Sequence, residues 1–153
     1  MLTRHPLTEA DKRAICAWDY PGEYALYNLP SYEEMQEKQR GFCHPQRAAN
    51  YHGFSEGETL VGYIHLREEE KEVFVGVGVH PALCGKGYGQ QLLAQTRPLA
   101  QTLYPGKPLY LQVRTWNARA IRCYERAGFR IDGDAFEQVT GSGKGTFYRM
   151  ILE

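Results

Sequence analysis

The sequence has no long apolar run. None of its stretches approaches the roughly 20 consecutive apolar residues that a membrane-spanning helix needs. The first residues, MLTRHPLTEADKR, are polar and lack the apolar core of a signal peptide. We therefore expect a cytoplasmic protein that has no membrane partner.

The sequence also lacks an excess of charge of either sign. Its 18 lysine and arginine residues balance its 18 aspartate and glutamate residues, so the formal net charge is zero. A chain without a basic field does not attract nucleic acid, and we expect no nucleic-acid partner. A length of 153 residues suits one domain with one core, which we place over residues 1–153.

Paired cysteines are missing as well. The four cysteines, Cys16, Cys43, Cys84 and Cys123, are far apart and form no C-x-x-C motif. Such spacing predicts neither a disulfide framework nor a zinc site, and we expect no metal ligands. The composition is that of an ordinary chain from a reducing compartment.

What the sequence does contain is a regular succession of helix and strand patterns. In chain order these predict a helix that starts after Thr8 and stops at Pro21-Gly22, a helix from Ser31 to about Arg40, a hairpin of residues 49–54 and 60–66, a strand over Val73–Val79, a helix that Pro98 kinks or breaks, a strand over Leu109–Arg114, a helix over residues 118–127, and two last strands, near Phe129 and over residues 146–152. The glycine-rich segment 141–145 is expected to be a mobile loop. The two glycines within Val73–Val79 indicate a bulge or the close approach of a ligand or another backbone.

Three glycines follow the strand over Val73–Val79 and precede the next helix. Gly85, Gly87 and Gly89 lie where the N–H groups of a helix start are free, so that the backbone could cradle a phosphate group. The segment lacks the hydroxyl residue of the NTPase phosphate loop and differs from G-x-G-x-x-G. A plain tight turn that enters a helix is the alternative interpretation.

A second pattern joins Asn117 to Tyr124. The two residues are two helical turns apart, so they share one helix face at a separation of about 10 Å along the axis. Taken singly, Asn117 has the character of an N-cap, and Tyr124 has that of a half-buried aromatic residue.

Together, the two patterns resemble the GNAT superfamily of acetyltransferases. The resemblance rests on the run V-G-V-H-P-A-L-C-G-K-G-Y-G over residues 77–89 and on N-A-x-A-I-x-x-Y-E-x-A-G-F over residues 117–129. It implies an α/β fold of the α+β type, with a mixed, mostly antiparallel sheet flanked by helices. The central strands, Val73–Val79 and Leu109–Arg114, would splay apart to admit acetyl-CoA.

The resemblance also implies roles for individual residues. The cofactor-binding set would comprise Val77, Gly78 and Val79, whose backbone would hydrogen-bond the pantetheine arm; Gly85, Lys86, Gly87, Tyr88, Gly89 and Gln90, whose N–H groups would hold the pyrophosphate; and Asn117, which would contact the cofactor near the splay. Tyr124 would be the catalytic residue, because it would lie beside the thioester sulfur and protonate the departing thiolate.

Three positions depart from the family pattern. Cys84 stands where relatives usually carry Arg or Gln, and it is either a small hydrophobic filler or a thiol acidified by the helix start. Gln112 stands where relatives that acetylate protein N-termini often carry a glutamate base, and Val73 stands where histone-type relatives carry one early in the central strand. A base is therefore either unnecessary or supplied by another residue, and the available alternatives are Glu72, His65 and His80.

We therefore predict an enzyme that moves the acetyl group of acetyl-CoA to an amine by direct attack. The acceptor is expected to be a small-molecule or metabolite amine of positive charge, drawn to an aromatic and acidic segment that carries Asp19, Glu23, Glu33 and Glu34. Three alternatives stay open: a non-catalytic acetyl-CoA sensor or interaction domain, an acetyltransferase of protein N-termini or lysines, and a nucleotide-binding protein. The sequence also leaves a homodimer open.

Overall fold

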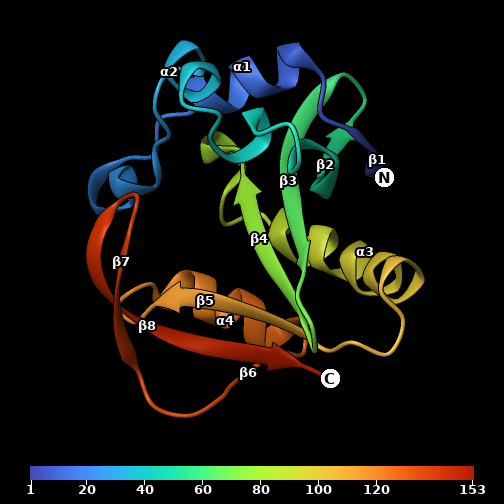
Figure 1. Cartoon of the computed structure of the whole chain (residues 1–153), viewed down its shortest axis with the longest axis vertical. Coiled ribbons are helices and arrows are strands. Elements are labelled where there is room, and N and C mark those ends of the chain that lie inside the picture. The colour runs from blue at the N-terminus through green and yellow to red at the C-terminus, as the bar shows by residue number, and fades with distance from the viewer. The chain divides into compact units, whose positions relative to one another are not determined.

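The computed structural model describes all residues, 1–153, as two compact units (Figure 1). The first unit comprises Met1–His65 and Val77–Tyr88, and the second comprises Leu66–Gly76 and Gly89–Glu153. The chain passes between the units three times: inside β3 (Thr59–Glu68), inside β4 (Val73–Val79) and at the start of α3 (Tyr88–Leu103). The single domain expected over residues 1–153 stays a prediction.

The first unit is built on antiparallel strands with short helices. β1 (Thr3–Pro6) pairs with β2 (Tyr51–Glu56), and β2 pairs with β3. The helices of this unit are α1 (Glu9–Ala17) and α2 (Tyr32–Glu37), with the 3₁₀ turns η1 (Gly22–Tyr27), η2 (Gly41–Cys43), η3 (Ala48–Asn50) and η4 (Pro81–Leu83). Four buried side chains form its hydrophobic cluster: Ile15, Trp18, Met35 and Phe42.

The sequence predicts the helix starts of the first unit better than the helix ends. Thr8 caps α1 through a complete capping box with Asp11, as the pattern indicated. However, α1 ends at Ala17, before Pro21-Gly22, because Trp18 leaves the helix with an extended backbone and packs into the cluster. Strand β1 was not predicted, since a four-residue segment with two charged or ionisable side chains gives little strand signal.

The second unit contains the parallel pairing of the fold. β4 pairs in parallel with β5 (Leu109–Arg114), which pairs antiparallel with β8 (Gly143–Leu152). β6 (Arg130–Ile131) and β7 (Phe136–Thr140) also pair antiparallel with β8. The predicted class, a mixed and mostly antiparallel α/β fold, is therefore confirmed. None of the helices combines the length and apolar character that crossing a membrane requires.

The pairing of β4 with β5 is very short. It comprises only the residue pairs Val73↔Leu109 and Phe74↔Tyr110. Val75 and the residue after it continue β4 within the same unit but have no partner on β5. The expected splay of the two central strands is thus present, because β4 and β5 stop pairing after Phe74 and Tyr110.

Helix α4 (Ala118–Arg126) lies on one face of β5 and β8 in the second unit (Figure 1). Along β5, Leu109 and Leu111 are buried and stand opposite Leu152 and Met150 of β8. A Cβ atom at Gly128, just after α4, would lie 3.1 Å from Leu152. These leucines and the methionine therefore belong to the helix-covered face, and the alternate residues of β5 belong to the opposite face.

Two expectations about the second unit are corrected. Of the kink or break expected at Pro98, the break is wrong, because α3 runs unbroken to Leu103. Pro98 lies on the exposed side, where the carbonyl left without an N–H partner can bind water. The expected mobile loop 141–145 is instead a tight turn between β7 and β8, and its last three residues belong to β8. Strand β7 was missed because its partner segment is rich in glycine.

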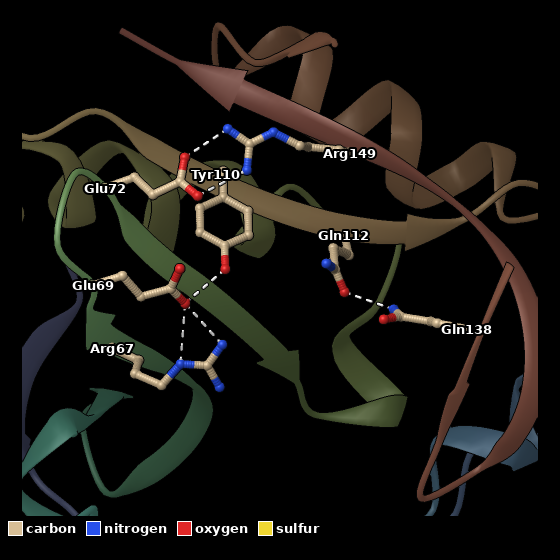
Figure 2. Close-up of polar contacts among 7 residues, drawn as sticks. All are labelled: Arg67, Glu69, Glu72, Tyr110, Gln112, Gln138 and Arg149. Carbon is tan, nitrogen blue, oxygen red and sulfur yellow. Dashed lines mark hydrogen bonds and ion pairs between the residues drawn. The ribbon is translucent and has the colours of Figure 1, made fainter. Parts of the chain in front are cut away.

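A polar network ties the turn between β3 and β4 to the neighbouring strands of the second unit (Figure 2). The Tyr110 hydroxyl donates a hydrogen bond to Glu69 Oε2 at 2.7 Å, and Arg67 donates two to the same oxygen. Arg149 of β8 donates to both carboxylate oxygens of Glu72, at 3.0 and 2.6 Å. The Arg149 guanidinium also lies 4.5 Å from the centre of the Tyr110 ring. These contacts hold the short β4–β5 pairing in place.

Tyr110→Phe should lower the free energy of unfolding at neutral pH by about 1 kcal/mol, the order of one hydrogen bond to a charged but partly exposed group. The Tyr110 hydroxyl is the main cause that holds the pKa of Glu69 below its usual value. A depressed carboxylate pKa contributes stability above the unfolded-state pKa, and this contribution is lost as pH falls through the folded-state pKa. The free energy of unfolding in urea should therefore differ between wild type and Tyr110→Phe at neutral pH, and this difference should become smaller at acidic pH. A difference independent of pH would contradict the assignment.

Candidate functional site

The end of β4, Val77 to Val79, lies in the first unit. The Val79 carbonyl oxygen accepts a hydrogen bond from the Tyr20 hydroxyl at 2.7 Å. A Cβ atom at Gly78 would overlap the ring of Tyr63. The glycine at this position is thus explained by the close packing of Tyr63 on the strand, where the sequence indicated a bulge or a ligand.

The glycine loop follows in the same unit, between η4 and α3. Gly85 and Gly87 have φ angles of +79° and +87°, in the left-handed region that glycine adopts without strain. Around each of them, a Cβ atom would meet nothing within 4 Å. The loop is exposed, and the N–H groups that open α3 have no partner within the helix. This backbone is suited to an anion.

Side chains near the loop have structural partners. The Tyr88 hydroxyl donates to Glu56 at 3.2 Å, whereas Lys86 is exposed. The Cys84 thiol donates long hydrogen bonds to the carbonyl oxygens of Val79 and His80, at 3.8 and 3.6 Å. These contacts favour the interpretation of Cys84 as a small filler against the end of β4.

The remaining residues of the predicted cofactor site lie in the second unit, at the starts of α3 and α4. Gln90 donates a hydrogen bond from Nε2 to the carbonyl oxygen of Cys123 at 3.0 Å. A Cβ atom at Gly89 would lie 2.9 Å from the Cys123 sulfur, so a side chain there would push the two helices apart. Gly89 and Gln90 therefore serve the packing of α3 on α4, and they place the start of α3 beside the residue that precedes Tyr124.

Asn117 stands directly before α4, and Tyr124 lies within α4, as the sequence pattern predicted. The Asn117 side chain accepts a hydrogen bond from the Ala120 N–H at 3.1 Å and is the N-cap of the helix. Tyr124 is half-buried, and its ring packs edge-on against Phe129 with the ring centres 6.3 Å apart. The plain structural roles weighed for each residue are therefore present. They fix both side chains on one rigid element.

Comparison with known proteins identifies the family. A model of the acetyltransferase (GNAT) family matches residues 13–129, which include the glycine loop and α4. The chain belongs to the acetyltransferase (GNAT) family. It is also similar to the N-alpha-acetyltransferase RimI of Mycobacterium tuberculosis, with 34% identity over 108 residues. That match spans 65% of this chain and 65% of the relative's length.

Solved structures show the same fold. Spermidine N-acetyltransferase from Vibrio cholerae, in complex with CoA and spermine, has a TM-score of 0.78 at 21% identity, over 99% of this chain and 94% of that one. The ribosomal-protein-S18-alanine N-acetyltransferase from Escherichia coli has a TM-score of 0.68 at 20% identity, over 99% and 93%. At such identities the likeness supports the fold of this GNAT protein and nothing more specific.

Gln112 and Val73, the two positions at which the resemblance suggested a glutamate base, carry no carboxylate. Val73 is buried in the short β4–β5 pairing. The Gln112 carbonyl oxygen accepts a hydrogen bond from the Gln138 amide of β7, and the two amides face each other across the strands (Figure 2). Gln112 thus ties β7 to β5.

The three alternative bases are also engaged in structure. Glu72 is held by both terminal nitrogens of Arg149. His80 accepts a hydrogen bond at Nδ1 from the Ala82 N–H at 3.0 Å and thereby caps η4. The His65 ring stacks on Tyr51 with a separation of 4.1 Å. Each of the three side chains therefore makes a structural contact.

Two of the four acidic residues of the aromatic and acidic segment pair with cations within the first unit. Asp19 accepts a hydrogen bond from Asn28, Glu33 pairs with Arg13, and Glu34 pairs with Lys38, which leaves Glu23 exposed and without such a partner. The aromatic residues of this segment differ in burial. Trp18 is buried in the cluster, and Tyr24 and Tyr27 are half-buried. No three His, Cys, Asp or Glu side chains are grouped so that they could hold a metal ion.

Burial raises the pKa of the Cys123 thiol, and the nearby charge of Arg126 opposes this only in part. Because the thiolate is the reactive form, native Cys123 should react with iodoacetamide much more slowly at neutral pH than it does in urea-unfolded protein. Peptide mapping by mass spectrometry measures both rates. Equal rates in native and unfolded protein would show that Cys123 is an available nucleophile.

Proposed function

We propose that this protein transfers the acetyl group of acetyl-CoA to an amine. The observation that carries the proposal is the family match over residues 13–129, because this range contains both motifs of the resemblance. The brief pairing of β4 with β5 supports it. Backbone groups of β4 that β5 does not use can bind an extended ligand, in the manner of an added strand.

The cofactor assignments follow the two motifs. We assign the pantetheine arm to the backbone of Val77, Gly78 and Val79, and Asn117 to a contact further along the cofactor. The N–H groups of Gly85, Lys86, Gly87, Tyr88, Gly89 and Gln90 are assigned to the pyrophosphate, whose charge the dipole of α3 favours. Cys84 removes one polar anchor that relatives have, and exposed Lys86 can add positive charge.

Tyr124 is assigned as the general acid of direct acetyl transfer. A neutral amine attacks the thioester carbonyl carbon, and backbone N–H groups of β4 stabilise the oxyanion that forms. As the carbon–sulfur bond breaks, the Tyr124 hydroxyl gives its proton to the sulfur. The new amide nitrogen loses one proton, which restores the tyrosine hydroxyl through water. Cys123 has no part in these steps.

The acceptor is assigned as a small-molecule or metabolite amine of positive charge. Gln112 supplies no base, so the amine must react in its neutral form, and activity rises with pH. A second candidate is acetylation of protein N-termini, because the RimI relative is an N-alpha-acetyltransferase. A non-catalytic acetyl-CoA sensor would bind the cofactor and never turn it over. A cytoplasmic location and a homodimer stay predictions.

Gly87→Asp should weaken acetyl-CoA binding strongly in calorimetry, because a carboxylate would stand against the pyrophosphate at an exposed left-handed position. Gly106→Asp is the matched control. Gly106 has a φ of +82° and equally open surroundings in the turn after α3, so it reproduces the backbone strain without the anion site. Unchanged affinity in folded Gly87→Asp would remove the loop from the cofactor site.

Tyr124→Phe should lower kcat by about 10²–10⁴-fold, as expected for loss of a general acid, while acetyl-CoA affinity stays near that of the wild type. The ring and its packing on Phe129 are retained. Thiol release from acetyl-CoA is followed with a panel of small amines and peptides with free N-termini. Undiminished kcat would make Tyr124 a packing residue, and acetylation of the peptides alone would overturn the small-amine assignment.

A further inference from the structure

Arg114, the last residue of β5, is a buried charge that the proposed chemistry does not use. It is 7% exposed, and it is the only Lys, Arg, Asp or Glu of the chain that is buried. Its guanidinium stays charged in proteins, and a buried charge is costly unless it is paired. Arg114 ends a strand in which every residue except Gln112 is buried.

The chain gives this guanidinium very little to bind. Its one polar contact is from Nη2 to the Thr140 hydroxyl at 3.4 Å, and the group also lies 4.8 Å from the centre of the Phe147 ring. No carboxylate forms a salt bridge with it. None of its nitrogens is both fully buried and without a partner, so the unused N–H groups reach the surface.

Other arginines on the same face of the second unit are treated differently. Arg67 binds Glu69, and Arg149 binds both Glu72 and Asp132. The chain thus supplies carboxylates to these two partly exposed guanidiniums and supplies none to the more buried one. Arg67 and Arg149 have carboxylate partners within the chain, and Arg114 has none. This difference indicates that an anion from outside the chain binds the Arg114 guanidinium.

The shape around Arg114 is also adapted to it. A Cβ atom at Gly145 of β8 would overlap the Arg114 guanidinium, so the glycine leaves the space in which this group lies. Arg114 follows Gln112 and Tyr110 on alternate residues of β5, on the face opposite α4. It therefore lies on the other side of β5 from the helix that carries Asn117 and Tyr124, which argues against a CoA phosphate as the anion.

We propose that Arg114 binds a carboxylate group of the amine acceptor, so that the substrate is an amino-acid-like compound with both an amine and a carboxylate. A single guanidinium matches the single charge and the planar oxygens of a carboxylate, which it can hold with two parallel hydrogen bonds. The neutral amides of Gln112 and Gln138 stand next along the face and can bind uncharged parts of the acceptor. The inference rests on the proposed acetyl transfer. It keeps a cationic amine on the acceptor and adds a carboxylate, so the acceptor as a whole is a zwitterion.

The test compares acceptors that share an amine and differ in the carboxylate. The standard amino acids and their carboxamides are assayed by thiol release from acetyl-CoA with wild type, Arg114→Gln, Arg114→Lys and Thr140→Val. In the wild type, KM for the best amino acid should lie about 10- to 100-fold below that of its amide, the range expected for hydrogen bonds to a charged group. Arg114→Gln should reduce this ratio to near one, and Arg114→Lys should give an intermediate ratio.

Thr140→Val is the matched control, because it removes the one polar contact of Arg114 within the chain and leaves the guanidinium. It should retain the preference for the acid. Calorimetric binding of the amino acids to the CoA-loaded protein gives a readout without turnover, and acetyl-CoA binding reports folding. Carboxylates that bind wild type but not Arg114→Gln support the inference even if no acetylation occurs, in which case the proposed function alone fails. Equal binding of acids and amides, or a preference that survives in Arg114→Gln, overturns it.

Discussion

The parallel pairing between β4 and β5 is the constraint on which the rest of the structure depends. Two residue pairs join the strands, and then β4 continues without a partner on β5. Backbone N–H and C=O groups need partners when they are shielded from water, so a strand that ends its pairing early offers unused groups to a ligand. The contacts of Glu69 with Tyr110 and of Glu72 with Arg149 tie the start of β4 to β5 and β8, where the paired residues lie.

Local patterns predicted much of this fold because the residues that carry them act within a few positions. Thr8 caps α1, and Asn117 caps α4, through side chains that reach only three residues along the chain. The bounds Val73–Val79 and Leu109–Arg114 follow from runs of β-branched and apolar residues. Strands β1 and β7 could not be predicted in this way, since polar, short segments become strands only through the partner that they meet.

The glycines of the candidate site show where sequence reasoning reaches its limit. Gly85 and Gly87 adopt left-handed backbone conformations in open space, which agrees with a loop shaped for an anion. Gly78 and Gly89 are required by neighbouring side chains, those of Tyr63 and Cys123. The sequence does not distinguish these four glycines from one another. Only the folded structure shows which of them pack against a side chain far along the chain and which lie in open space. Arg114 was missed for the same reason, because the lack of a carboxylate around it is a property of the folded chain.

The way the chain alternates between the two units has a consequence for its synthesis on the ribosome. The first unit needs β4 and the glycine loop, so it is incomplete until Tyr88 has emerged, although most of its residues lie before position 66. The second unit begins within β3 but gains β5 only at residues 109–114 and β8 only at residues 143–152. Domains generally fold as units and N-terminal parts first. A nascent chain of this protein therefore leaves Val73 and Phe74 of β4 without their partner strand until β5 has been made. A C-terminal truncation that removes β8 would leave β5 without its antiparallel neighbour.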